Sequence, residues 1–245
     1  QFTVKVCDAE ADSSTVELEA AILQHLERIN PDLEVPKVVR SNNGRSSETF
    51  SWQEKAYTLR ILTFVAGTLY SATDPNDRLW NSLGALMGRI GQALVGFSHP
   101  NAHRSGFIWN LDAAFSCRSY AGTIVDRNDR EMVERVFAHY QQAVMPQLPA
   151  LRRAVIHGDA NDNNLVVDEQ NRVCGLFDFG DVCEGYQVYE LAITLAYALM
   201  GVDDIIGAAQ TIIAAYVQHM KLSEAELDVL FALLELRLAV SICIS

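Results

Sequence analysis

Several features of large protein classes are missing from this chain. No apolar stretch reaches the roughly 18 residues that a transmembrane helix needs. The longest such stretch, residues 191–202, is short and contains Thr194. No secretory signal peptide is recognisable. These absences argue against a membrane-spanning or secreted protein.

Cysteine is scarce and follows no pattern. The number of cysteines is odd, their spacings are wide and no C-x-x-C pair occurs, which argues against a disulfide framework or a zinc site. We therefore expect free thiols in a reducing compartment, which for this chain means the cytoplasm. The five cysteines are Cys7, Cys117, Cys174, Cys183 and Cys243.

Basic residues are outnumbered by acidic ones. The 245 residues include 19 Lys and Arg against 31 Asp and Glu, so the formal net charge is -12. Such a chain is a poor partner for nucleic acid or an anionic membrane. It is better suited to a cationic ligand, or to a ligand held through metal ions. The apolar fraction of 49% is that of an ordinary globular protein, and the length predicts one large domain or two small ones.

Glycine-rich phosphate loops are also missing, since neither G-x-G-x-x-G nor a P-loop occurs. The chain begins at Gln1 in a segment with the pattern of a strand interior and stops at Ser245 inside an apolar run. We therefore expect it to be an excised piece of a larger protein.

The order of predicted elements indicates an α+β protein in two lobes. Alternating, β-rich segments at 2–7, 50–52 and 57–65 surround one helix at about 15–29. Helical patterns dominate afterwards, at 79–96, 129–145, 190–200, 205–220 and 224–242. We expect a β-rich part at 1–65 and a larger helical part at 66–245. A cleft between two lobes is a common ligand site.

The densest polar cluster is V-I-H-G-D-A-N-D-N-N-L-V-V at 155–167, followed by R-V-C-G-L-F-D-F-G-D at 172–181. Residues 165–167 and 172–177 are predicted to form a hairpin, with a turn at 168–171. Asn164 and Asp178 should then lie side by side at its open end, as an amide and a carboxylate suited to Mg²⁺. Asp159, in the loop leading to the same end, could accept a proton from a hydroxyl. Alternatively, such residues are only turn formers and helix caps.

The combination H-G-D-x-x-x-x-N and F-D-F-G-D resembles the aminoglycoside phosphotransferase and choline kinase family, small-molecule relatives of the protein kinases. This resemblance implies a two-lobed, protein-kinase-like fold with a truncated N-terminal lobe. It also implies that Asp159 is the catalytic base and that Asn164 and Asp178 hold Mg²⁺. Asp181 is a further carboxylate often seen after this metal motif, or else a solvated loop charge.

A kinase needs a lysine for the nucleotide phosphates and a glutamate to hold it. Lys5 lies in the first strand, and Glu19 shares an apolar helix face, where a lone carboxylate would be costly. Glu17 is the rival partner, but we expect it to be occupied in a capping box with Ser14. Each charge alone could be an ordinary surface residue. The connector at 62–65 resembles the hinge, so Thr63, Phe64 and Val65 would bind the purine.

Within the family, S-G-F-I-W-N-L at 105–111 and R-L-A-V-S-I-C-I-S at 237–245 resemble the hydroxylysine kinase branch, whose domains occur fused ahead of an aminotransferase. Trp109 would be a wall of the acceptor site, or a core aromatic residue anchoring its loop. Asp162, Asp181 and Glu184 could form an acidic rim for an ammonium group, or be solvated loop charges. The family's two strands and phosphate-covering loop before the lysine are missing from this chain.

These observations predict a kinase that moves the γ-phosphoryl group of ATP or GTP, with Mg²⁺, to the hydroxyl of an amino alcohol such as hydroxylysine. Choline, ethanolamine, homoserine and an aminoglycoside are the alternative acceptors. Two other classes stay open, namely a catalytically impaired, kinase-like regulatory domain and a metal-dependent hydrolase that would not need Lys5.

Overall fold

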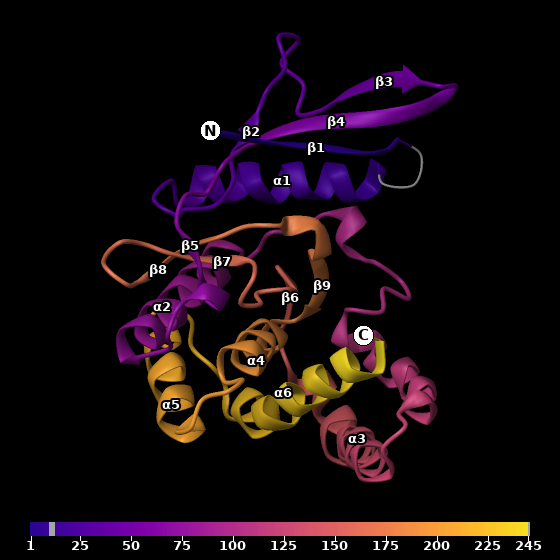
Figure 1. The fold of residues 1–245 in the computed structure, drawn as a ribbon, viewed down its shortest axis with the longest axis vertical. Helices are drawn as coiled ribbons and strands as arrows, with labels where there is room; N and C mark the ends of the chain where they lie inside the picture. The colour runs from indigo at the N-terminus through magenta and orange to yellow at the C-terminus, as the bar shows by residue number, and fades with distance from the viewer. Residues whose placement is uncertain (10–12, 245) are drawn as a thin grey trace.

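An antiparallel sheet with one helix beneath it forms the N-terminal part of the fold (Figure 1). The computed structural model describes residues 1–9 and 13–244. Strand β4 lies at the centre of this sheet and pairs with β1, β2 and β3. The elements are β1 (Phe2–Asp8), α1 (Ser13–Ile29), β2 (Val38–Val39), β3 (Glu48–Trp52) and β4 (Lys55–Thr63).

Side chains along β1 alternate between an exposed face and a face directed toward the rest of the molecule. Phe2, Val4 and Val6 are exposed, whereas Lys5 on the opposite face is half-buried and reaches α1. The apolar face of α1 is buried and carries Glu19 with it. The helix begins at Ser13, so the expected capping box, with Ser14 ahead of the helix, was wrong in its register.

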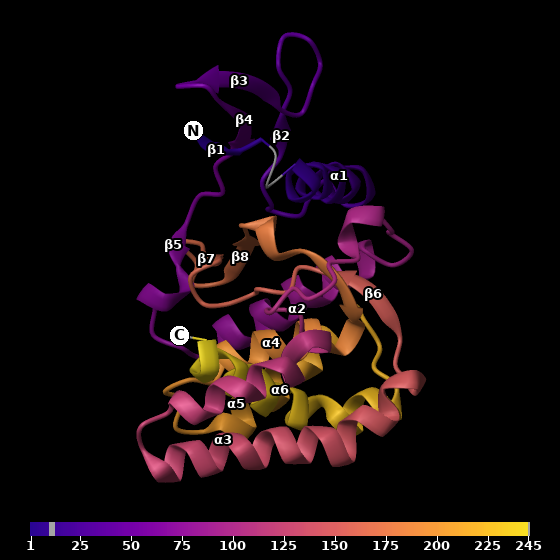
Figure 2. The same ribbon diagram turned by 90° about the vertical axis from the view of Figure 1, so that its right-hand side faces the viewer.

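The C-terminal part is a group of packed helices that carries five short strands in two small sheets, with loops between them (Figures 1 and 2). Helix α2 packs on α5, and α4 packs on α6. A Cβ on Gly84 would lie 2.1 Å from the carbonyl oxygen of Ile212, so glycine permits the close approach of α2 to α5. The helices are α2 (Asp77–Ala93), α3 (Arg127–His139), α4 (Gln187–Ala198), α5 (Ile205–Tyr216) and α6 (Glu224–Ile244).

One predicted helix is interrupted. The segment expected to be helical over 129–145 leaves the α conformation after α3, passes through a π turn at Tyr140–Val144 and continues as a 3₁₀ segment at Met145–Ala150. Pro146 has no amide hydrogen to donate, and its ring disfavours the α conformation at the residue before it. A further 3₁₀ segment at Leu111–Thr123, absent from the sequence-based expectation, joins the loop of Trp109 to the helices.

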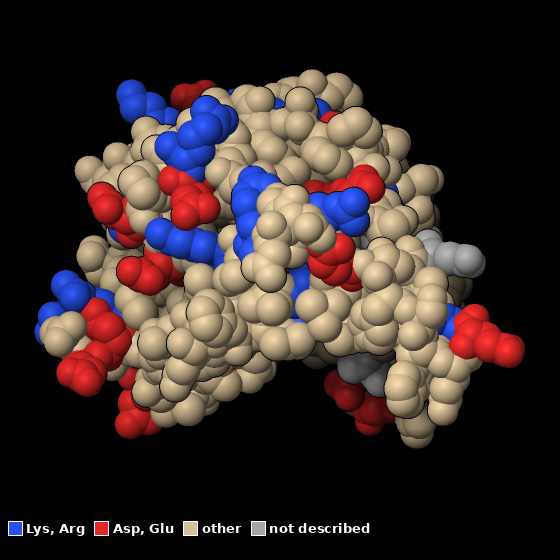
Figure 3. Space-filling model, turned by 90° about the horizontal axis from the view of Figure 1, so that it is seen from above, with Lys and Arg blue, Asp and Glu red and all other residues tan. Residues whose placement is uncertain are grey.

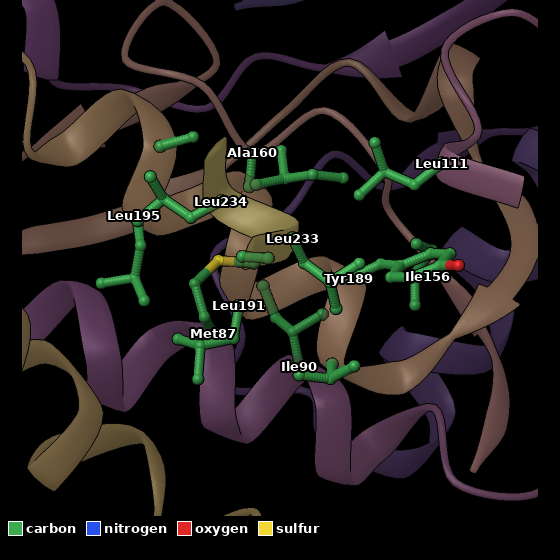
Figure 4. Close-up of a cluster of buried hydrophobic side chains, with 14 of the residues drawn as sticks. Met87, Ile90, Leu111, Ile156, Ala160, Tyr189, Leu191, Leu195, Leu233 and Leu234 are labelled. Carbon is green, nitrogen blue, oxygen red and sulfur yellow. The ribbon is translucent and has the colours of Figure 1, made fainter. Parts of the chain in front are cut away.

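A continuous apolar core lies beneath the polar loop at 157–164. Figure 4 shows side chains from α2, α4 and α6 pointing toward one another and toward Ala160, which is fully buried. Ala160 directly follows Asp159, so this packing anchors the loop that carries the predicted base.

The expected hairpin is confirmed. Strand β7 (Leu165–Val167) pairs with β8 (Val173–Leu176), with Leu165 opposite Leu176. Strand β5 (Thr68–Leu69) adds to β7 and connects the two parts of the fold. A separate pair, β6 (Arg153–Ile156) and β9 (Cys183–Tyr186), flanks this hairpin. Among the described residues, no helix has the length and apolarity to cross a membrane.

Candidate active site

A cavity of about 480 Å³ opens between the sheet and the hairpin. Lys5 and Asp178 lie on its wall, and most of the other lining residues, which come from both parts, are apolar. All three predicted hinge residues line it as well. The lining residues are Thr3, Lys5, Pro36, Leu62, Thr63, Phe64, Val65, Gly67, Leu69, Val166, Phe177 and Asp178.

Lys5 lies between two carboxylates at the inner end of this cavity. Its Nζ donates to Glu19 Oε1 at 3.0 Å and to Asp178 Oδ1 at 2.9 Å. Burial works against the charge, but the hydrogen bonds and charges of the two partners raise the pKa of Lys5. Glu17, the rival partner, is exposed and accepts a hydrogen bond from Asn101 Nδ2 at 3.1 Å. The structure therefore brings together the expected Lys5 and Glu19.

Arg60 is a second cation on Glu19 that the sequence analysis missed. It lies opposite Lys5 in the β1–β4 register, and its Nε donates to Glu19 Oε2. The carboxylate of Glu19 is 1% exposed and thus carries one cation on each oxygen. A cation directly across from Lys5 on a neighbouring strand was the available signal, because cross-strand partners share a face.

Asn164 and Asp178 meet at the open end of the hairpin, as its geometry requires. The Phe177 amide donates to the Asn164 carbonyl at 3.0 Å, which places Asp178 one residue beyond this closing bond. Asp178 has a left-handed φ of 61°, a conformation that Asp tolerates better than most residues. Burial opposes ionisation, but the hydrogen bond and charge of Lys5 hold the pKa of Asp178 below its usual range.

Asp159 is held by three side-chain donors. Its Oδ2 accepts from Asn161 Nδ2 at 2.9 Å and from Asn164 Nδ2 at 2.8 Å. Its Oδ1 accepts from Arg237 Nη2 at 3.0 Å. Burial raises the pKa of Asp159, while the donors and the guanidinium of Arg237 act against that rise. Asn164 donates to Asp159 through Nδ2, and no hydrogen bond among the described residues uses its amide oxygen, so that oxygen is available to another partner.

The chain turns sharply at Gly158 to present Asp159. Gly158 has a φ of 79°, and a Cβ there would lie 3.0 Å from the carbonyl oxygen of Asp181. A larger residue would therefore be both strained and crowded. Beneath this turn, Glu190 Oε2 accepts from the His157 amide at 2.5 Å. Burial raises the pKa of Glu190 to about 7.

The residues predicted for the acceptor side separate into two groups. The carboxylate of Asp181 interacts electrostatically with Asp159 and Asp178, and burial raises the pKa of Asp181. Trp109 lies under the guanidinium of Arg237, which is 4.9 Å from its ring centroid. These two residues thus border the site.

The other two lie elsewhere. Glu184 pairs with Arg153 at 3.3 Å and lines a different cavity beside His99. The carbonyl of Asp162 accepts from the Ser71 amide at 2.9 Å, and its carboxylate accepts from the neighbouring Asn163 at 3.2 Å. The described contacts do not join either residue to Asp159.

The amino-acid sequence of residues 1–224 matches the model of the phosphotransferase enzyme family. The chain belongs to this family. Hydroxylysine kinase from Xenopus laevis is 27% identical over 259 residues, which cover 99% of this chain and 69% of the relative. Hydroxylysine kinase from Mus musculus is 32% identical over 190 residues, which cover 73% of this chain and 50% of the relative. The chain thus spans about half to seven tenths of the length of the relatives it matches.

Comparison of the fold with solved structures agrees with the fold expected from the sequence. The structure of the amicoumacin kinase hAmiN superimposes with a TM-score of 0.74 at 21% identity and covers 99% of this chain and 73% of that one. The expected mixed, protein-kinase-like fold is confirmed. The family and these relatives identify the chain as a phosphotransferase, and the nucleotide phosphate donor follows from the kinase relatives.

Proposed function

We propose that the protein transfers the γ-phosphoryl group of ATP or GTP to the hydroxyl of an amino alcohol, with hydroxylysine as the first candidate. The observation that carries the proposal is the chain of contacts Glu19–Lys5–Asp178 at the end of the cavity. An ammonium group held on the wall of this cavity, beside a carboxylate and an amide oxygen, suits a nucleotide and its metal. The hydroxylysine kinase relatives support the choice of acceptor.

Lys5 and the cavity wall would hold the nucleotide. In this proposal the purine lies against Thr63, Phe64 and Val65, and Lys5 binds the phosphates while Glu19 keeps its ammonium in place. The oxygen-only donors Asn164 and Asp178 fit Mg²⁺, which neutralises phosphate charge when it is bound.

Asp159 would then act on the acceptor. Its carboxylate takes the hydroxyl proton as the hydroxyl oxygen attacks the γ-phosphorus. The bond from that phosphorus to the β–γ bridging oxygen breaks, and the nucleoside diphosphate leaves. Catalysis is mainly positioning and charge stabilisation, with the base adding to both.

The acceptor should carry a positive charge. Asp181 adds a partly buried carboxylate next to Asp159 and Asp178. An ammonium group would interact favourably with the carboxylate of Asp181, whereas a neutral polyol would not. The acidic balance of the whole chain points the same way, although acidic and basic side chains are interspersed on the face seen in Figure 3.

The test is steady-state phosphoryl transfer by the full-length protein. Hydroxylysine, ethanolamine, homoserine and glycerol are offered with ATP or GTP to wild type and Asp159→Asn. We expect turnover with amines, poor turnover with glycerol, and a loss on the order of 10²–10⁴ in rate for Asp159→Asn. Asp168→Asn is the matched control, because Asp168 only closes the hairpin turn with Arg172.

Any of three results would contradict the proposal. Glycerol matching the amines would remove the argument from charge. Full activity in Asp159→Asn would remove the assigned base. Absence of transfer to any acceptor would remove the kinase function itself.

A further inference from the structure

Arg237 is a buried cation at the centre of the helical part. It lies on α6, is 1% exposed and uses each of its three nitrogens. Nη2 donates to Asp159 Oδ1 at 3.0 Å, Nη1 to the Trp109 carbonyl at 3.1 Å, and Nε to Tyr197 Oη at 3.2 Å. A cation this deep in a protein needs a charged partner, and Asp159 is the carboxylate that pairs with it.

The hydrogen bonds around Asp159 distinguish its two oxygens. A carboxylate oxygen has two lone pairs. On Oδ2, both are used by the amides of Asn161 and Asn164. On Oδ1, the described residues supply one donor, Arg237. An incoming hydroxyl therefore finds its open position on Oδ1, the oxygen that Arg237 holds.

The same guanidinium also fixes the loop of Trp109. The planar guanidinium of Arg237 thus sets the distance between Oδ1 of Asp159 and the backbone of Trp109. The same guanidinium also lies over the Trp109 ring. If Asp159 or Trp109 moved relative to the other, a hydrogen bond to Arg237 would break. Arg237 is buried, so water could not replace the lost bond.

We propose that Arg237 is a positioning residue for phosphoryl transfer: it aims Oδ1 of Asp159 at the acceptor hydroxyl and holds the Trp109 loop at that distance. This inference rests on the proposed function, in which Asp159 is the base. It predicts that Arg237 acts through Asp159 and has no separate effect on the nucleotide.

A double-mutant cycle of transfer rates tests the inference in the full-length protein. The variants are Arg237→Met, Asp159→Asn and the combination, assayed with hydroxylysine and ATP. We expect Arg237→Met to lower kcat on the order of 10²-fold, since misplacing a catalytic group by about 1 Å has that effect. In the Asp159→Asn background the same substitution should lower kcat by less than about threefold, because residues acting as one unit are not additive. The nucleotide Kd should stay within about twofold throughout.

The control separates positioning from stability. Arg152 forms a similar pair with the buried Glu226, at 2.6 Å and away from Asp159. Arg152→Met should lower the melting temperature while kcat stays within about twofold. If the loss of kcat follows the melting temperature in both variants, Arg237 is only structural and the inference is overturned.

Arg237→Lys keeps the inference testable if Arg237→Met does not fold. Lysine retains the charge but not the planar fork, so it should recover part of the kcat and show the same non-additivity with Asp159→Asn. Equal losses of kcat in the wild-type and Asp159→Asn backgrounds overturn the inference while the kinase function stands. An inactive wild-type protein overturns the proposed function, and this inference with it.

Discussion

Glu19→Gln is the substitution whose consequences the structure defines best. The carboxylate is 1% exposed and carries Lys5 on one oxygen and Arg60 on the other. Gln is nearly isosteric, but it removes the negative charge and turns an amide NH₂ toward one of the cations. Lys5 keeps Asp178 as a partner, whereas the hydrogen bond that Arg60 keeps within the described part of the chain is the one to Cys7 Sγ at 3.3 Å.

The cost follows from removing the buried anion that compensates two partly buried cations. Removing one partner of a buried pair costs roughly 3–5 kcal/mol. Because Lys5 retains Asp178 and Gln retains one acceptor oxygen, we expect the lower end, about 3 kcal/mol. For a chain of this size, about 1 kcal/mol shifts the melting temperature by roughly 2–4 °C, so the variant should melt about 6–12 °C lower.

The measurement is thermal unfolding of the full-length protein by calorimetry, with Glu17→Gln as the matched control. Glu17 lies on the same helix but is exposed, so its variant should melt within about 2 °C of wild type. Titration of nucleotide below both melting temperatures should show weaker binding in Glu19→Gln alone. Similar melting of both variants would show that Glu19 is not the buried anion that the geometry indicates.

The remaining predictions concern the metal and pH. Asp178→Ala should abolish the Mg²⁺ dependence of nucleotide binding, because Asn164 is neutral; calorimetric titration with and without Mg²⁺ checks this, and unchanged metal dependence would refute the assignment. Burial raises the pKa of Glu190 to about 7, so between about pH 5 and 7 the folded protein keeps a proton that the unfolded chain releases. Stability contributed by the protonated Glu190 is therefore lost as pH rises through this window, by on the order of 3 kcal/mol. Glu190→Gln should remove that loss. The melting temperature of the variant should therefore rise relative to that of wild type between pH 5 and pH 7. If the difference between the two melting temperatures does not change with pH, the assigned pKa is refuted.

The parts of the site that were predictable from sequence involve residues that are close in sequence or that belong to a recognisable motif. The hairpin follows from two short β-rich runs with a turn between them, so the meeting of Asn164 and Asp178 is a consequence of pairing geometry. Lys5 and Glu19 are 14 residues apart on adjacent elements, and the apolar face of α1 required a partner for the glutamate. The roles of these residues in catalysis stay predictions.

The parts that could not be predicted depend on long-range packing. Asp159 and Arg237 are 78 residues apart in sequence and meet because α6 crosses beneath the loop. The apolar run around Arg237 was a signal, not used in the sequence analysis, that this cation needs a partner, but it does not identify the carboxylate. Glu184 was expected near the acceptor, as part of an acidic rim with Asp162 and Asp181. Pairing of β9 with β6 instead places it beside Arg153, since side chains alternate along a strand.

His157 holds the predicted base, Asp159, and the segment of the predicted metal ligand Asp178 together as one unit. Its Nδ1 lies 3.2 Å from the Asp159 amide and its Nε2 lies 3.1 Å from the Phe177 carbonyl. An amide can only donate and a carbonyl can only accept, so the ring must be neutral with its proton on Nε2. Burial lowers the pKa of His157 to about 4, which keeps this form at physiological pH. The ring therefore ties the backbone of Asp159 to the residue before Asp178 with two bonds that a protonated imidazole could not both make. Together with Arg237 on the side chain of Asp159, this link fixes the predicted base relative to the predicted metal ligand from below the cavity, where neither substrate would need to displace it.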